Sequence, residues 1–320
     1  MDEMATAQNG TGLVLDAFFY LHDVRFGPEV AERMGVIEKA LEKSGLLEKV
    51  VRIEPRTALA SDIYLVHSPK YFQQVKKDVE FGAGELSTGD TEVSEHSLEV
   101  AMKATGGVLE ALDAVVKGKV RNAFCCVRPP GHHATPTKGM GFCVFNHVAI
   151  AARYARKMYR LERVLIVDWD VHHGNGTQEA FYEDGGVLFF SSHQELLYPG
   201  TGRREETGSG KGAGLIVNAP LPEGSGYVDI LAEMDTRLEE KVREFRPELV
   251  LISAGFDARA GDPMGDFTLS DEEFGLLTRK VVGWAEEFAA GRLVSVLEGG
   301  YNLETLGGAA AAHVGALLEG

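Results

Sequence analysis

The sequence is poor in cysteine and has no surplus of positive charge. Three cysteines occur among 320 residues, and the first ten residues, MDEMATAQNG, are acidic and polar. A secretory signal peptide needs an apolar segment, so we expect reduced thiols and a cytoplasmic protein. The 32 Lys and Arg residues stand against 48 Asp and Glu residues, which gives a formal net charge of −16. This charge excludes a general DNA or RNA coat protein and favours basic partners.

The sequence also lacks long apolar runs, repeats and linkers. No stretch of about 18 consecutive apolar residues occurs, so we expect neither a membrane-spanning helix nor a membrane partner. Neither a repeat of fixed period nor a Pro- or Ser-rich linker divides the chain. We therefore predict a disordered tail over residues 1–10 and a single domain over 11–320. The sequence leaves the oligomeric state open.

Short apolar runs alternate with helical patterns along the chain. Continuous runs of four to six apolar residues predict strands that are buried on both faces. They lie at 12–16, 122–127, 163–170, 187–193, 214–221, 249–256 and 292–300. Amphipathic patterns predict helices at 28–50, 97–118, 148–160, 227–245 and 270–291. This alternation predicts an α/β fold with a mostly parallel sheet and helices on both faces.

Polar and glycine-rich segments follow five of the seven predicted strands. In open parallel sheets the functional site lies beyond the carboxyl ends of the strands. In the segment DWDVHH, alternate residues point the same way if the strand continues, so Asp170 and His172 would project together. Asp257 follows another strand. Two carboxylates and one imidazole suit zinc with one position left open, and Fe²⁺ or Co²⁺ would also fit.

A pair of histidines forms the second candidate group. His132 and His133 follow two prolines and a glycine in RPPGHH, and a rigid loop that presents two imidazoles suits general acid–base catalysis. Asp168 is the obvious carboxylate to hold one imidazole in its tautomer. Tyr301 follows Glu298-Gly299-Gly300. Its phenol could donate a hydrogen bond to a developing oxyanion.

These segments, in this order, closely resemble the histone deacetylase superfamily. The matching segments are RPPGHHA, GFCVFNH, DWDVHHGNGTQ, SSHQ with YPGTG, SAGFDARAGDP and LEGGY. HHGNGTQ is similar to the class II branch and to bacterial deacetylase-like amidohydrolases. The resemblance covers about residues 13–315. It implies a single-domain arginase-like fold with a central eight-stranded parallel sheet, and zinc-dependent hydrolysis of acetylated or otherwise acylated amines.

The resemblance implies a role for each candidate catalytic residue. The zinc ligands would be Asp170, His172 and Asp257. His133 would be the general base and later the acid, with Asn175 behind it. His132 would act electrostatically while hydrogen-bonded to Asp168. Tyr301 would polarise the amide carbonyl together with zinc.

The resemblance also implies a substrate channel and bound potassium. Phe142 and Tyr198 would wall an acyl-lysine channel, and Gly141 would let the substrate stem approach. Asp90 would grip substrate backbone amides at the rim, and Arg33 would line an internal channel that releases acetate. One potassium ion would lie beside Asp168, Ser191 and the carbonyls of Asp170 and His172. A second would lie near Phe181 and Val187.

Three features depart from the family or remain unassigned. Gly27 stands where the family usually has a histidine, which puts rim contacts there in doubt. The segment 203–213, RREETGSGKGA, is a charged insertion that fits a solvated loop. Met264 follows Asp262-Pro263 where acetylpolyamine-specific members often carry a glutamate. Met264 therefore favours acyl-lysine or broad small-acyl substrates.

Three alternatives stay open beside a deacetylase of acyl-lysine. One is an acetylpolyamine or other small-molecule amidohydrolase that uses the same site. A dinuclear manganese hydrolase needs D-x-H-x-D, but Gly174 occupies the fifth position and Arg259 stands two residues after Asp257. A non-catalytic acyl-lysine binder would be marked by loss of Tyr301 or of a tandem histidine, and all three residues are present.

Overall fold

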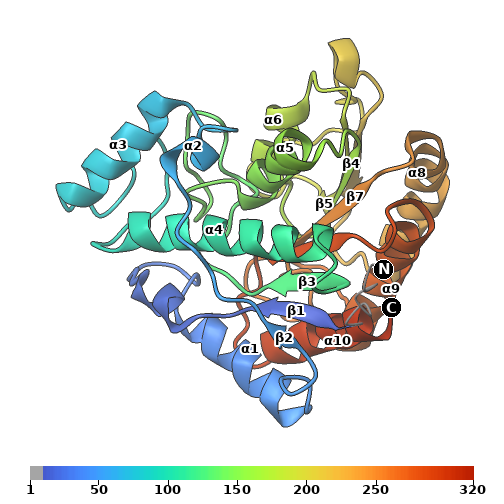
Figure 1. Cartoon of the computed structure of the whole chain (residues 1–320), viewed down its shortest axis with the longest axis horizontal. Coiled ribbons are helices and arrows are strands. Elements are labelled where there is room, and N and C mark those ends of the chain that lie inside the picture. The colour runs from blue at the N-terminus through green and yellow to red at the C-terminus, as the bar shows by residue number, and fades with distance from the viewer. Residues whose placement is uncertain (1–9) are drawn as a thin grey trace, which may run out of the picture.

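A computed structural model describes residues 10–320 as one eight-stranded sheet between two layers of helices (Figure 1). All neighbouring strands are parallel, in the order β2-β1-β3-β8-β7-β4-β5-β6. The strands are β1 (Thr11–Val14), β2 (Val51–Arg52), β3 (Asn122–Cys125), β4 (Val164–Asp168), β5 (Val187–Gln194), β6 (Ile216–Leu221), β7 (Leu249–Ala254) and β8 (Leu293–Leu297). The expected α/β fold with eight parallel strands is confirmed.

Helices cover both faces of the sheet. They are α1 (Glu32–Lys43), α2 (Ala60–Ile63), α3 (Pro69–Glu80), α4 (Ser97–Val116), α5 (His147–Tyr159), α6 (Asn175–Phe181), α7 (Tyr227–Glu233), α8 (Glu239–Phe245), α9 (Asp271–Phe288) and α10 (Leu306–Glu319). The long α4, which crosses in front of the sheet in Figure 1, packs with α5. On the other face α9 packs against α10, and α10 packs against α1. Each layer buries the apolar side of the strands from water.

The seven strands predicted from apolar runs are all present, because each run is buried on both faces. Every residue of β3, β4, β5, β7 and β8 is buried. The edge strand β2 was not predicted, since its two residues are exposed and carry no apolar run. Cys125 and Cys126 are fully buried core residues with free thiols, as their apolar surroundings indicate.

Two local predictions need correction. The strand at 163–170 ends at Asp168, so Asp170 and His172 lie in a turn rather than on a continued strand. The helix expected over 227–245 is interrupted by a π-helical turn at Met234–Leu238. The sequence pattern also missed α10, because this alanine- and glycine-rich helix is buried on several sides and shows little amphipathic contrast.

Helix ends follow the expected chemistry. The Ser270 side chain accepts from the Glu273 amide, and the Glu273 carboxylate accepts from the Ser270 amide, which together form a capping box at the start of α9. Gly118 and Gly291, just beyond α4 and α9, have φ angles of +66° and +76°, which glycine adopts readily. Residues 1–9 of the tail predicted over 1–10 lie outside the described residues, and the carbonyl of its last residue, Gly10, accepts a hydrogen bond from the Arg121 amide.

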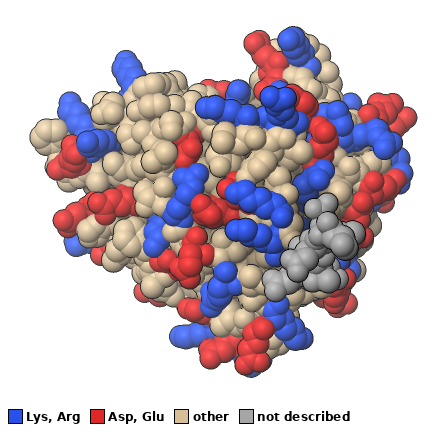
Figure 2. Space-filling view, in the orientation of Figure 1, with Lys and Arg blue, Asp and Glu red and all other residues tan. Residues whose placement is uncertain are grey.

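Residues 10–320 contain no helix that is long and apolar enough to cross a membrane. On the face shown in Figure 2, basic and acidic side chains are interspersed. The surplus of acidic residues therefore does not gather into one continuous patch on that face.

Candidate active site

Four neighbouring strands at the centre of the sheet deliver the candidate residues. β3, β8, β7 and β4 lie side by side, and their registers are nearly level at the carboxyl end. The histidine pair follows β3, Asp170 and His172 follow β4, Asp257 follows β7 and Tyr301 follows β8. His132 and Tyr301 are 169 positions apart in the sequence, yet both lie at the carboxyl edge of the sheet.

Asp170, His172 and Asp257 form a buried cluster that could hold a metal ion. One ligand atom from each lies within 4.8 Å of the others. The Nδ1 atom of His172 is 3.0 Å from Asp170 Oδ1 and 3.1 Å from Asp257 Oδ2. Burial and the neighbouring Asp170 carboxylate raise the pKa of Asp257 to about 7. Two buried carboxylates so close together repel each other, and a divalent cation bound between them would offset that repulsion.

The backbone around this cluster is fixed by the same carboxylates. The amide of Val171 donates to Asp257 Oδ1 at 2.9 Å, and the amide of Gly299 donates to Asp170 Oδ2 at 2.8 Å. The amide of His172 also donates to Asp170 Oδ1 at 2.9 Å. These bonds hold Asp170 and His172 together in a turn, so the convergence expected from strand alternation is reached by another route.

Each histidine of the tandem pair has its own polar partner. His132 Nδ1 lies 2.9 Å from Asp168 Oδ2, and His133 Nδ1 lies 2.8 Å from Asn175 Oδ1. Their ring centroids are 4.0 Å apart. The Asn175 amide nitrogen donates to the His133 carbonyl at 3.3 Å, so its oxygen faces the ring and His133 Nδ1 carries the hydrogen. The other nitrogen of His133, Nε2, is therefore left as an acceptor.

The surroundings shift the pKa values of the two histidines in opposite directions. Burial opposes protonation of His132, but the carboxylates of Asp168 and Asp170 raise its pKa well above the usual value. Burial, His132 and His172 lower the pKa of His133 well below the usual value. At neutral pH the pair therefore offers one cationic and one neutral imidazole.

A narrow channel leads from the surface to this cluster. Its volume is about 150 Å³. It is lined by Asp90, His133, Gly141, Phe142, His172, Tyr198, Met264 and Tyr301. The Phe142 ring lies 5.7 Å from the Tyr301 ring, and the Tyr198 ring lies 5.2 Å from the His133 ring. Gly141 has a φ angle of +55°, and a Cβ there would meet His133 Cδ2 at 2.3 Å, so only glycine fits this wall.

Tyr301 and Arg33 meet behind the channel. Burial raises the pKa of Tyr301 well above its usual value, although Arg33 opposes this. The Arg33 guanidinium lies 4.8 Å from the centre of the Tyr301 ring. Arg33 is fully buried and donates to the carbonyls of Gly300 at 2.7 Å and Glu298 at 2.5 Å. It therefore lies inside the protein beneath the site and not in the channel lining.

Two other expected residues have contacts within the chain. Asp90 is exposed, and its carboxylate accepts from the Gly141 amide at 2.8 Å and from the Tyr198 hydroxyl at 2.9 Å. These bonds tie together the two walls of the channel. Ser191 is buried and pairs with Asp168 in the register of β4 and β5. Its hydroxyl lies 3.0 Å from His193 Nδ1.

The charged segment 203–213 packs against the protein through a polar network. The Glu206 carboxylate accepts from Gln178 Nε2 at 2.6 Å and from the Gly202 amide at 3.3 Å. Gln178 Oε1 in turn accepts from Asn218 Nδ2 at 2.6 Å and lies 3.1 Å from His173 Nε2. Glu206 thus anchors the segment, while its arginines point to the surface as expected of a solvated loop.

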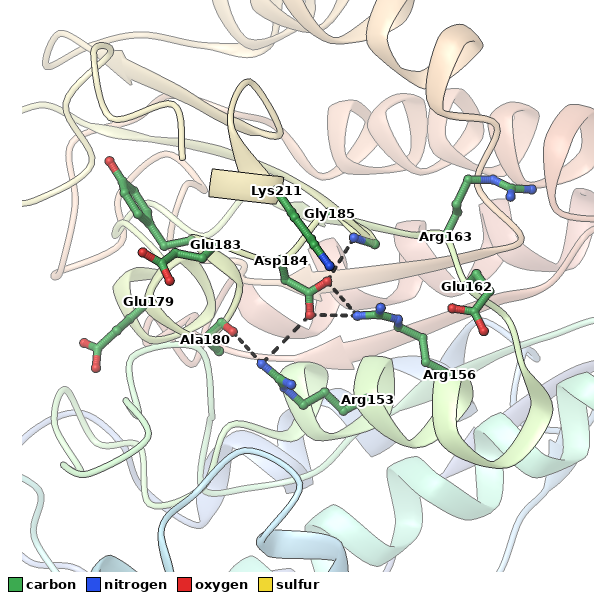
Figure 3. A pocket seen from close by; sticks show the side chains of 12 residues that line it. Arg153, Arg156, Glu162, Arg163, Glu179, Ala180, Glu183, Asp184, Gly185 and Lys211 are labelled. Carbon is green, nitrogen blue, oxygen red and sulfur yellow. Dashed lines mark hydrogen bonds and ion pairs between the residues drawn. The ribbon is translucent and has the colours of Figure 1, made fainter. Parts of the chain in front are cut away.

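A larger hollow of about 840 Å³ lies at the opposite end of the sheet, before β5 begins (Figure 3). Arg156 donates to both oxygens of Asp184 at 2.7 and 2.8 Å, and Arg153 donates to the Ala180 carbonyl at 2.8 Å. The Gly186 amide also donates to Asp184. The central charges of this hollow are paired with one another, and none of the candidate catalytic residues lines it.

Comparison with known proteins decides the family. Residues 27–317 match the family model "Histone deacetylase domain". The chain belongs to the histone deacetylase family. It is 40% identical over 297 residues to a "Probable deacetylase" of Archaeoglobus fulgidus, which covers 92% of this chain and 82% of the relative. It is also 40% identical over 301 residues to "Histone deacetylase 10, chloroplastic" of Oryza sativa, covering 89% and 68%. "Polyamine deacetylase HDAC10" of Danio rerio is 41% identical over 301 residues, covering 91% and 44%.

The membership expected from the motifs is confirmed, but sequence reasoning missed several residues around the histone deacetylase site. The carboxylates of Glu298 and Asp262 hold backbone amides of the catalytic loops. The bond between Asp90 and Tyr198 was also not foreseen. A buried acidic residue directly after an apolar strand, as in VSVLEGG, was the available signal for Glu298.

Proposed function

We propose that this chain is a zinc-dependent deacetylase that hydrolyses the amide of acetylated lysine side chains or related acylated amines. The observation that carries the proposal is the buried Asp170, His172 and Asp257 cluster at the inner end of a narrow channel. His133 and Tyr301 line the same channel. The general base, the phenol and the metal-ligand cluster therefore all border the same narrow channel.

The ligand set fits zinc. Two carboxylate oxygens and one imidazole nitrogen are common zinc ligands, and catalytic sites use three protein ligands with one open position. A zinc ion held there would acidify water and polarise a carbonyl oxygen. Arg259 and Gly174 stand where a second metal would need ligands, which argues against the dinuclear manganese alternative.

The chain's own residues would divide the remaining work. His133 is neutral at pH 7 and its Nε2 is free, so it can take a proton from the attacking water. It can then return that proton to the leaving amine. The Tyr301 hydroxyl keeps its proton, because its pKa is raised, and can donate to the developing oxyanion. His132, held by Asp168, would supply positive charge beside the reacting centre.

The channel favours a slender, apolar substrate stem. Phe142 and Tyr198 form walls that suit the four-carbon stem of lysine and would exclude water from the amide. Met264 in the lining adds no charge for a polyamine. An acetylpolyamine is nevertheless the second candidate substrate, because one relative of 41% identity is named a polyamine deacetylase.

Two further features belong to the proposal. A potassium ion would lie beside Asp168 and Ser191, and a second near Phe181 and Val187. Arg33 would line an internal path for acetate. The buried Asp168 carboxylate at the end of β4 and the buried Ser191 hydroxyl opposite it in β5 support the first cation site.

The deciding experiment is acetate release by the purified chain. Acetyl-lysine peptides and acetylated polyamines are compared before chelation, after chelation and after zinc is restored. We expect turnover that chelation abolishes and zinc restores. The Tyr301→Phe variant should bind zinc normally and lose most turnover.

The outcomes separate the candidate functions. Faster turnover of peptides supports the acyl-lysine proposal, whereas preference for polyamines moves the function to small amines. Zinc binding without turnover of either substrate would require another acyl group. A protein with neither bound metal nor turnover would refute the enzyme proposal and leave the acyl-lysine binding module.

A further inference from the structure

Glu298 is a buried carboxylate to which the proposed reaction gives no role. It directly follows β8, and it is fully shielded from solvent. Its Oε2 atom accepts from the Gly131 amide at 2.6 Å and from the His132 amide at 3.1 Å, and its Oε1 atom accepts from the Ser253 hydroxyl at 3.1 Å. No Lys or Arg within the described residues forms a direct ion pair with this carboxylate. Burying it is costly, so its contacts must matter.

The two amides belong to the loop that carries the tandem histidines. Glu298 fixes the backbone of His132, while Asp168 fixes its ring. Gly131 cannot shift into spare space, because a Cβ there would meet the Phe145 carbonyl at 2.8 Å and the His147 amide at 2.9 Å. The hydrogen bonds from the Gly131 and His132 amides to the Glu298 carboxylate are called the clamp below. Because His133 is the next residue, this clamp sets the positions of both imidazoles.

The main chain of Glu298 leads to the tyrosine. Arg33 donates to the Glu298 carbonyl at 2.5 Å and to the Gly300 carbonyl at 2.7 Å, which holds the segment just before Tyr301. The Glu298 side chain reaches the histidine loop after β3, the strand beside β8. One residue therefore joins the loop of the base to the loop of the phenol.

We propose that Glu298 is a positioning residue, whose carboxylate sets the spacing between the His132–His133 pair and Tyr301. This inference rests on the proposed function of His133 and Tyr301. A misplacement of about 1 Å at a catalytic group can cost about 100-fold in rate. Loss of the clamp therefore acts on kcat, while KM, which depends on the channel walls, stays nearly constant.

Three substitutions of Glu298 in the whole 320-residue chain, loaded with zinc, test the clamp. Glu298→Gln keeps the length and an oxygen for both amides, and its NH₂ group can donate to Ser253. Glu298→Asp keeps the charge but is shorter by one methylene. Glu298→Ala removes both acceptors. Ser295→Ala is the matched control, since it deletes another buried hydrogen bond of β8, to His313 Nε2 at 2.8 Å.

We measure kcat, KM, bound zinc and melting temperature for each variant. Glu298→Ala and Glu298→Asp should lose about 10- to 100-fold in kcat with KM within about threefold and zinc retained. Glu298→Gln should stay within about fivefold of the wild type. Ser295→Ala should lower the melting temperature and leave kcat nearly unchanged. If Glu298→Ala does not fold, the Gln and Asp variants still decide the question.

Three results would overturn the proposal. The first is a Glu298→Asp enzyme that keeps wild-type kcat. The second is a Glu298→Gln enzyme as slow as Glu298→Ala, because charge and not the acceptor position would then be responsible. The third is a loss of stability in Glu298→Ala with kcat unaffected, as in Ser295→Ala.

A second readout does not depend on turnover. The proton NMR signal of His132 Nδ1–H should persist in Glu298→Gln and shift or vanish in Glu298→Asp. A wild-type protein that neither binds zinc nor releases acetate would refute the proposed function but not the clamp. The NMR comparison would then decide the clamp, and an unchanged signal in Glu298→Asp would overturn it.

Discussion

Gly299 is a position where the addition of one methyl group should disturb metal binding. An ideal Cβ at Gly299 would lie 2.0 Å from Asp257 Oδ2 and 2.6 Å from Asp170 Oδ2. Real Cβ atoms do not approach within 3.0 Å, so the Gly299→Ala variant must move a carboxylate by about 1 Å. Metal–ligand distances tolerate about 0.2 Å. We therefore expect zinc affinity to fall by about 10- to 100-fold, which is the usual loss when the residues that hold metal ligands in place are altered.

The assay is titration of zinc into the metal-free protein against a competing chelator. Gly283→Ala in α9 is the matched control, because a Cβ at Gly283 meets nothing within 4 Å. It should bind zinc like the wild type and stabilise the helix by up to about 1 kcal/mol. A Gly299→Ala protein that binds zinc within twofold of the wild type would refute the reasoning. The carboxylates would then not be confined by the chain after β8.

Three other expectations concern the channel and the core. Tyr301→Phe should lower kcat by about 10²- to 10³-fold with zinc affinity unchanged; a loss under tenfold in acetate release would contradict its role at the oxyanion. Tyr198→Phe removes the bond to Asp90 at the rim, so KM should change about 2- to 10-fold with kcat within twofold, and an unchanged KM would show that the bond is irrelevant to substrate. Burial lowers the pKa of His67 and of His313 to about 3. Below pH 6.5 the unfolded chain binds protons that these folded imidazoles refuse, so stability is lost as the pH falls from 6.5 towards 3. The free energy of unfolding should fall by up to about 1.4 kcal/mol per pH unit for each histidine, and urea unfolding at pH 7.5 and 5.5 that gave equal values would exclude this account.

The fold was largely predictable because its strands are buried on both faces. Runs such as LVLIS and RVLIV leave little choice of structure. The edge strand β2 has two exposed residues and no such run, so it depends on pairing with β1 and cannot be recognised alone. The sequence pattern did not predict helix α10 for the opposite reason, because a helix that is buried on several sides shows no amphipathic period.

The site was predictable in its residues and less so in its geometry. Strand alternation suggested that Asp170 and His172 converge, but β4 ends at Asp168 and a turn with backbone bonds to Asp170 brings them together. The partners of His133 and Asp90 depend on loops from distant parts of the chain. Asp90 was expected to face substrate, yet Gly141 and Tyr198 already bind it. Such tertiary contacts leave no periodic pattern.

The charges at this edge of the sheet give an independent argument for a bound cation. Four carboxylates are fully buried there, namely Asp168, Asp170, Asp257 and Glu298. Arg33 and Arg128 lie behind them, but both pair with Glu29, so this trio supplies one net positive charge. A cationic His132, favoured by the adjacent carboxylates, supplies a second. With His172 neutral, as a metal ligand must be, two negative charges remain without a partner, and buried charge is tolerated only when it is compensated. Without a metal, Asp170 and Asp257 outweigh the effect of burial and raise the pKa of His172 to about 10, so a proton on this imidazole offsets one of the two charges. A divalent ion bound at the Asp170–His172–Asp257 cluster would supply the missing positive charge. The same ion would therefore stabilise the folded protein and serve the proposed reaction.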